Sequence, residues 1–228
     1  MTTRDAYILL EPAHFLKDKE LVLPTTPEDV ETRRRIVDFI HEIDTARFML
    51  AMSYKEQYLD LVEEIDLNNK FKTEYFKQHY LYSALIWYHN SFDLVLQCLW
   101  FKHRLYGDIQ LHSNNIEKIL CDCKLSQIQK RLYNEQEDNP ITEFNKRNHE
   151  VHDLANRLKH RQYIENENYL LYAEALFILS DGYNSDDTKF HKKLADIQSR
   201  LVVYHKDIIS LAKEILLPIH NSISNLLE

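Results

Sequence analysis

The stretch that decides the expected fold and site is Arg147-Asn148-His149-Glu150-Val151-His152, inside a predicted helix over residues 140–161. Asn139-Pro140 begins this helix, because asparagine is a favoured N-cap and proline suits the first helical position. At about 100° per residue, Arg147 falls near the middle of an apolar stripe. A guanidinium in that position needs a partner or a ligand, because an unpaired buried charge is costly. The stripe consists of Phe144, Val151, Leu154, Ala155 and Leu158.

Polar residues flank this stripe and continue beyond it. One explanation is structural: Arg147 forms an ion pair across a helix bundle, and His152 is a hydrogen-bonded interfacial histidine. The amide directly after the arginine, the histidine five positions on and a later basic cluster favour a functional site instead. The flanking band contains Asn148, His152, Asn156 and Lys159, and the basic cluster one turn further on is Asn156-Arg157-Leu158-Lys159-His160-Arg161.

Arg147-Asn148-x-x-x-His152 resembles the R-polar-x-x-x-H motif of the HEPN superfamily, the higher eukaryote and prokaryote nucleotide-binding domains. The trailing Asn156-x-x-Lys159-His160-Arg161 is similar to an extension found in some prokaryotic branches. The resemblance covers residues 147–161, and the helical pattern of the whole chain is compatible with it. It implies a helical bundle that forms a symmetric dimer. In catalytic members it also implies metal-independent RNA cleavage, often within toxin–antitoxin or phage-defence systems, whereas other members only bind or scaffold.

The composition limits the classes of function. Only two glycines occur in 228 residues, so nucleotide binding through a G-x-G-x-x-G or Walker-type loop is excluded. The formal net charge of −8 argues against a general nucleic-acid coat protein, which would be basic. Any RNA contact must therefore be local and made by a basic patch. That patch would consist of Arg147, Arg157, Lys159, His160 and Arg161.

We expect no metal and no cofactor. His149 and His152 are three residues apart and could share a helix face, but no carboxylate or third histidine stands at a recognised ligand spacing. The three cysteines lack the spacing of a disulfide framework or a zinc site, which indicates a reduced, cytoplasmic protein. No signal peptide and no uncharged run of about 18 residues occurs, so no membrane association is expected.

The remaining pattern predicts an all-α fold with an N-terminal arm at residues 1–25 and one helical domain at residues 26–228. Thr26-Pro27 begins a helix that should reach residue 66. Because the joints between the long helices are short, neighbouring helices are expected to be antiparallel and to build an up-and-down bundle. Further helices are predicted over residues 72–105, 114–121, 125–136, 140–161 and 187–225, whereas residues 169–179 fit either a buried helix or a short hairpin and residues 181–185 have the composition of a loop.

A second polar line, Asn90, Asp93 and Gln97, runs along the helix predicted over residues 72–105. It has two explanations. The first is a solvated edge or a hydrogen-bonded layer of the bundle. The second is a supporting role, in which Asp93 lies against Arg147 or His152 and orients that side chain.

The same residues define a mechanism. Positions five apart on a helix differ by about 140° in direction, so Arg147 and His152 from two copies could line one cleft across a two-fold axis. In such a homodimer, we expect His152 to take the proton of the RNA 2′-hydroxyl or to give a proton to the leaving 5′-oxygen. Arg147 holds the phosphoryl oxygens with help from Asn148. Asn156 and the basic residues after it would contact the flanking RNA.

Three functions are compatible with these observations. The leading one is a metal-independent endoribonuclease of HEPN type, acting as a toxin or phage-defence effector with an antitoxin or defence-system partner protein. The second is a catalytically inactive HEPN-like module that binds nucleotide, RNA or protein. The third is a helical scaffold unrelated to that superfamily, which fits the acidic charge.

Overall fold

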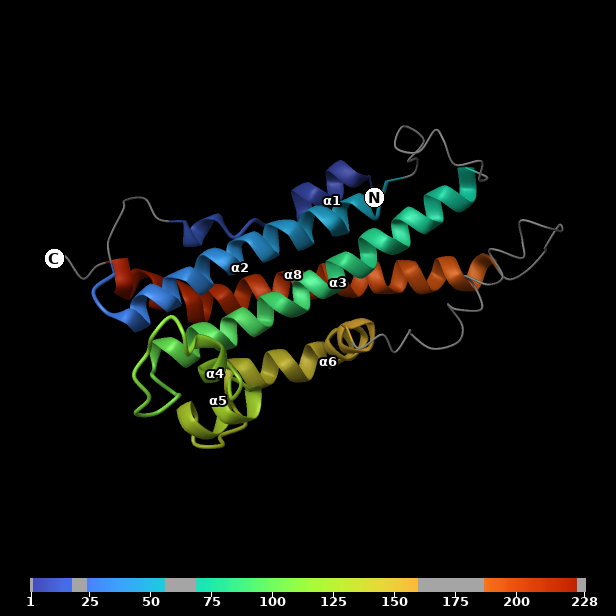
Figure 1. Cartoon of the computed structure of the whole chain (residues 1–228). Helices are drawn as coiled ribbons and strands as arrows, with labels where there is room; N and C mark the ends of the chain where they lie inside the picture. The colour runs from blue at the N-terminus through green and yellow to red at the C-terminus, as the bar shows by residue number, and fades with distance from the viewer. Residues whose placement is uncertain (1, 18–23, 56–68, 160–186, 225–228) are drawn as a thin grey trace. The chain divides into compact units, whose positions relative to one another are not determined.

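The computed structural model describes residues 2–17, 24–55, 69–159 and 187–224, and the regular secondary structure of these residues is helical (Figure 1). Of the described residues, 78% lie in α-helices and none lies in a strand. The all-α class predicted from the sequence is therefore confirmed. The helices are α1 (Thr3–Leu9), the 3-10 helix η1 (His14–Leu16), α2 (Pro27–Met52), α3 (Asn69–Lys102), α4 (Ile116–Leu120), α5 (Leu125–Leu132), α6 (Pro140–Lys159) and α8 (Asp187–Ser224).

Two of the predicted helix starts are confirmed by their capping bonds. Thr26 accepts from the backbone N–H of Asp29 at 3.1 Å, which begins α2. Asn139 accepts from the backbone N–H of Thr142 at 2.9 Å, which begins α6. Both bonds satisfy a helix N–H that has no partner within the helix.

The predicted end of the first long helix is wrong, because α2 stops at Met52 rather than near residue 66. The Ser53 side chain is buried and donates to the carbonyl of Leu50 at 2.6 Å. The Ser53 carbonyl in turn accepts from Gln198 of α8 at 2.9 Å. Helical periodicity does not reveal this end, because a residue distant in the sequence stabilises it.

The N-terminal arm contains a helix that its sequence pattern did not predict. In α1, Thr2 and Asp5 form a reciprocal capping box. The guanidinium of Arg47 lies 3.7 Å from the ring centre of Tyr7. Arg47 also donates to the carbonyl of Leu10 at 2.5 Å and to that of Tyr7 at 3.0 Å. This one arginine therefore ties the end of α1 to α2.

The contacts divide the chain into two compact units, each assembled from three separate stretches. The prediction of a single domain over residues 26–228 stays a prediction. Unit 1 comprises Met1–Leu10, Thr45–His89 and Glu150–His205, and unit 2 comprises Glu11–Asp44, Asn90–His149 and Lys206–Glu228.

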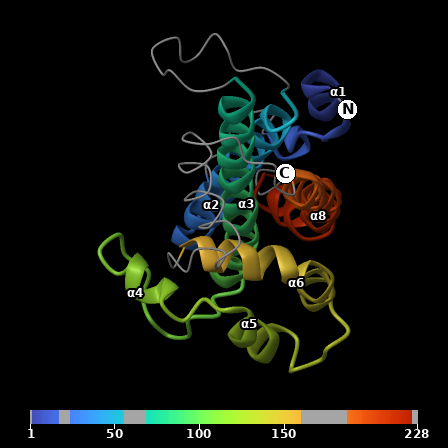
Figure 2. The same ribbon diagram turned by 90° about the vertical axis from the view of Figure 1, so that its right-hand side faces the viewer.

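Unit 2 is built around aromatic side chains of α3. Phe92 stacks on Phe144 of α6 with ring centres 5.0 Å apart. Trp100 is fully buried and donates from its indole nitrogen to the carbonyl of Ile119 in α4 at 3.1 Å. Gln129 of α5 donates to Thr142 of α6 at 2.7 Å. These bonds hold the short helices α4 and α5 beside the end of α3 and the start of α6 (Figure 2).

Candidate functional site

The burial pattern along α6 corrects the predicted position of Arg147. The Arg147 side chain is 62% exposed, whereas Asn148 is only 6% exposed. The apolar stripe therefore continues four residues after Phe144, at Asn148, and not three residues after it, at Arg147. Ile141, Phe144, Val151 and Ala155 are buried as part of this line, whereas Leu158 is only half-buried.

Asn148 lies at a kink of the helix. Its backbone leaves helical geometry at φ −111° and ψ 15°, which kinks α6. Its side-chain amide donates to the carbonyl of Phe144 and to the carboxylate of Asp207 in α8, each at 3.1 Å. The residue predicted to assist at a phosphate thus has both donors directed at the protein itself.

Asp207 is the carboxylate that the structure places beside the arginine. The distance from a guanidinium nitrogen of Arg147 to Asp207 Oδ1 is 4.0 Å, and Asp207 Oδ2 accepts from Asn148. A pair at this distance whose guanidinium is exposed contributes little to stability. Arg147 is therefore oriented towards α8 without being sequestered there.

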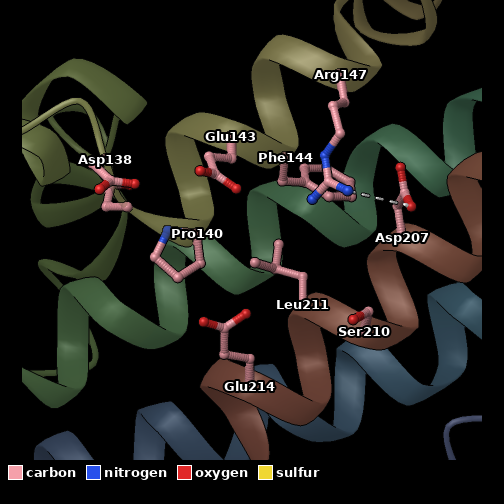
Figure 3. A pocket seen from close by; sticks show the side chains of 10 residues that line it. Asp138, Pro140, Glu143, Phe144, Arg147, Asp207, Ser210, Leu211 and Glu214 are labelled. Atoms are coloured by element: carbon pink, nitrogen blue, oxygen red, sulfur yellow. Dashed lines mark ion pairs between the residues drawn. The ribbon is translucent and has the colours of Figure 1, made fainter.

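Arg147 and Asp207 lie at the edge of a groove of about 300 Å³ within unit 2. Figure 3 shows the groove between α6 and α8, with the Arg147 side chain reaching across from α6. Four carboxylates and one guanidinium line it, so its electrostatic character is acidic. The lining residues are Asp138, Asn139, Pro140, Glu143, Phe144, Arg147, Asp207, Ser210, Leu211 and Glu214.

His152 lies in unit 1, on the other side of the kink in sequence, and is 6% exposed. Its Nδ1 is 2.8 Å from Nδ1 of His89 in α3, and the two rings meet edge to face with centres 5.1 Å apart. A hydrogen bond between two imidazole nitrogens requires one to donate and the other to accept. The Nε2 atom of His152 is buried.

Aromatic residues of α3 and α8 connect this histidine pair to a third histidine. The ring of Tyr204 lies edge-on to His152 with centres 5.6 Å apart. The Tyr204 hydroxyl donates to the backbone carbonyl of Tyr88 at 3.1 Å. The Tyr88 hydroxyl shares a hydrogen bond of 2.9 Å with Nδ1 of His205. Unit 1 therefore contains a buried cluster of His89, His152, His205, Tyr88 and Tyr204, which we call the His/Tyr cluster.

Burial and, as a smaller cause, the positive charge of Lys159 together lower the pKa of His89 from its ordinary value to about 4. Burial disfavours the charged imidazolium, and a nearby cation does the same. At neutral pH His89 is therefore a neutral imidazole with one protonated and one unprotonated ring nitrogen.

The remaining predicted site residues fall into three groups. Asn156, Arg157 and Lys159 are exposed at the end of α6, as a surface for RNA would require. Asp93 is half-buried in unit 2, where burial and, as a smaller cause, the charge of Asp93 raise the pKa of the Cys123 thiol. The structure records Asp207, where the sequence pattern had suggested Asp93, as the carboxylate beside Arg147. His160 and Arg161 lie outside the described residues.

Three residues of the site are not evident from the sequence pattern. His89 directly precedes the polar line that begins at Asn90, and this neighbourhood was the only signal pointing to it. Asp207 stands between the buried residues Tyr204 and Ile208, so its carboxylate borders an apolar face. Tyr204 resembles any core tyrosine.

No group of three or more histidine, cysteine, aspartate or glutamate residues in the described ranges is arranged to hold a metal ion. Within the same ranges, none of the helices combines the length and apolar character needed to cross a membrane. Comparison with protein-family models, with curated proteins and with solved structures gives no match to this chain.

Proposed function

We propose that this protein is a metal-independent endoribonuclease of HEPN type. The observation that carries the proposal is the division of roles within Arg147-Asn148-x-x-x-His152. Arg147 presents an exposed guanidinium, and His152 is hydrogen-bonded by a second imidazole. A base oriented by another side chain is a recurring arrangement in proton-transfer sites. A regulated toxin or defence effector, with an antitoxin or defence-system partner protein, is the biological role we assign to it.

The proposed assembly is a symmetric homodimer of up-and-down helical bundles with α6 at the interface. Within unit 2, α3 contacts α6 and α6 contacts α8, through Phe92–Phe144 and Asn148–Asp207. Such lateral contacts are those of a helical bundle. A two-fold axis beside α6 would place two Arg147 side chains in one cleft. Light scattering at micromolar concentration tests this assembly, and a monomer would contradict it.

The proposed reaction is attack of a 2′-oxygen on the adjacent phosphorus. The His152 of one copy takes the hydroxyl proton as the new O–P bond forms. The His152 of the second copy, entering as imidazolium, gives a proton to the leaving 5′-oxygen as the old P–O bond breaks. Arg147 stabilises the charge that gathers on the phosphoryl oxygens. The products are a 2′,3′-cyclic phosphate and a 5′-hydroxyl, and exposed Arg157 and Lys159 contact the flanking RNA.

The experiment is incubation of the purified protein with total RNA in EDTA, followed by analysis of the new ends. Cleavage should persist in EDTA, leave a 2′,3′-cyclic or 3′-phosphate, and fail at a nucleotide carrying 2′-O-methyl. Arg34→Ala is a matched control for Arg147→Ala, because the Arg34 side chain is 63% exposed and lies on α2. An intact RNA pool with wild-type protein would refute the proposal.

A second function, an inactive HEPN-like module that binds a protein or RNA, is favoured by two specific observations. His152 Nε2 is buried, whereas a proton-transfer group must come within hydrogen-bond reach of the 2′-hydroxyl. The groove beside Arg147 carries four carboxylates, which repel phosphates and suit a cationic protein segment. Binding without cleavage, weakened by Glu143→Gln and Glu214→Gln, would support this function over the ribonuclease.

A further inference from the structure

His89 and His152 form a direct hydrogen bond across two helices, at 2.8 Å between their Nδ1 atoms. His89 comes from α3 and His152 from α6, 63 positions apart in the sequence. Both rings are at least nine-tenths buried, with exposed fractions of 9% and 6%. The bond therefore fixes one ring nitrogen of each residue inside the protein.

The direction of this bond follows from the chemistry of proton transfer. A neutral imidazole carries its proton on one nitrogen only, so the bonded His152 is either an Nδ1–H donor or an Nδ1 acceptor. The imidazolium form carries protons on both nitrogens and can only donate. If His152 takes up and releases a proton while keeping its bond to His89, then its Nδ1 must donate in both states and its Nε2 must be the nitrogen that titrates.

We propose that His89 is the positioning residue of His152: its Nδ1 accepts the Nδ1–H of His152 and leaves Nε2 of His152 as the basic nitrogen. This inference rests on the proposed ribonuclease function. In the bond, His89 holds its own proton on Nε2. It plays the part that a carboxylate plays for the histidine of a hydrolase triad, with a neutral ring in place of an anion.

The surroundings keep His89 suited to accept. Burial and the charge of Lys159 hold its pKa at about 4, so its Nδ1 lone pair stays free of a proton at neutral pH. The charge of Lys159 on α6 acts on His89, and the ring of Tyr204 on α8 lies edge-on to His152. Beside them, the rings of Tyr88 on α3 and His205 on α8 contact each other. Tyr88 and His205 bond to each other, and the Tyr204 hydroxyl donates to a backbone carbonyl.

The test reads the tautomer of His152 directly. In protein labelled with ¹⁵N in its histidines, long-range proton–nitrogen correlation at pH 7 should show His152 protonated at Nδ1 and bare at Nε2. His89→Phe removes the acceptor, and His152 should then shift towards the Nε2–H tautomer that exposed imidazoles favour. His89→Asn supplies an amide oxygen as acceptor and should restore the Nδ1–H tautomer. Tyr88→Phe, which removes the neighbouring bond to His205, should leave the His152 tautomer unchanged.

Cleavage kinetics provide the second arm. His89→Phe should lower kcat by roughly 10²-fold, leave KM within about twofold and alter the acid limb of the pH profile, and His89→Asn should recover most of the rate. An Nε2–H tautomer in the wild type, or an unchanged Nδ1–H tautomer in His89→Phe, would overturn the positioning role whether or not RNA is cut. The expected tautomers with no cleavage by the wild type would refute the ribonuclease and leave the pairing intact.

Discussion

The two sides of the kink in α6 place neighbouring motif residues in opposite environments. Before the kink, Arg147 is 62% exposed and borders a groove lined by carboxylates. After it, His152 is 6% exposed and hydrogen-bonded to a neutral histidine within the His/Tyr cluster. A charge left in water keeps its hydration, whereas a buried imidazole must have its polar atoms satisfied by the protein. Substitutions of Arg147 and of His152, five positions apart in one motif, are therefore expected to have different effects on stability.

The largest effect expected from this contrast is on RNA cleavage. Arg147→Ala should lower the rate by ~10²–10³-fold through lost charge stabilisation. His152→Asn should lower it by ~10²–10⁴-fold, because an amide cannot titrate. Asparagine is chosen at 152 because its amide can still donate to His89. The measurement is single-turnover cleavage of a fixed RNA in EDTA. Loss of activity in only one of the two variants would show that the motif does not act as a unit.

The next effect concerns the stability of the folded protein in acid. We expect it to depend on His89, which is hydrogen-bonded to His152 on the buried side of the kink. The pKa of His89 is about 4 in the folded protein, below its ordinary value of 6.5. As the pH falls, the unfolded chain binds this proton at a higher pH than the folded protein does. The stabilisation contributed by neutral His89 is therefore fully present above pH 6.5. It is lost as the pH falls towards 4, by up to about 3 kcal/mol.

Urea unfolding at a series of pH values between 4 and 7.5 measures this loss. The His89→Asn variant lacks the titrating ring, so the difference between wild type and variant isolates its contribution. The wild type should lose more stability than the variant across this window. Parallel curves for the two proteins would mean that His89 is not held neutral by the fold.

A smaller effect is expected at the kink itself. Asn148→Ala removes two hydrogen bonds, to the carbonyl of Phe144 and to the carboxylate of Asp207. The loss should be about 1–3 kcal/mol, because the bond to a charged acceptor is stronger than a neutral one. Asn156→Ala, at an exposed position of the same helix, serves as the control in thermal and urea unfolding. Equal stability of the two variants would remove the structural role assigned to Asn148.

The smallest effect is expected on stability when the exposed Arg147 is substituted. Arg147→Ala should change the free energy of unfolding by no more than about 0.5 kcal/mol, because the Arg147 side chain is 62% exposed and lies 4.0 Å from Asp207. Arg34→Ala should behave in the same way. A loss of several kcal/mol in Arg147→Ala would instead identify the arginine as a structural ion pair, the alternative weighed from the sequence.

Local signals were sufficient for most of the helical framework. The caps at Thr26 and Asn139 act on backbone groups three residues away, so their sequence signature predicts α2 and α6 to begin where they do. The helix predicted over residues 187–225 corresponds to α8. The end of α2 escaped prediction because Gln198, 145 positions from Ser53, stabilises it.

What the sequence by itself determined is the all-helical class, the main helix starts and the presence of an arginine, an amide and a histidine on one helix. Only the tertiary structure decided which of them face the protein. Counting from Phe144, positions 147 and 148 both lie within an apolar stripe about 100° wide, so periodicity cannot choose between them. In the folded protein Asn148 is the buried one of the two, and Asp207, 59 residues away, accepts a hydrogen bond from its amide. The role of His89 also depends on tertiary packing, because its hydrogen bond to His152 forms only when α3 and α6 pack together.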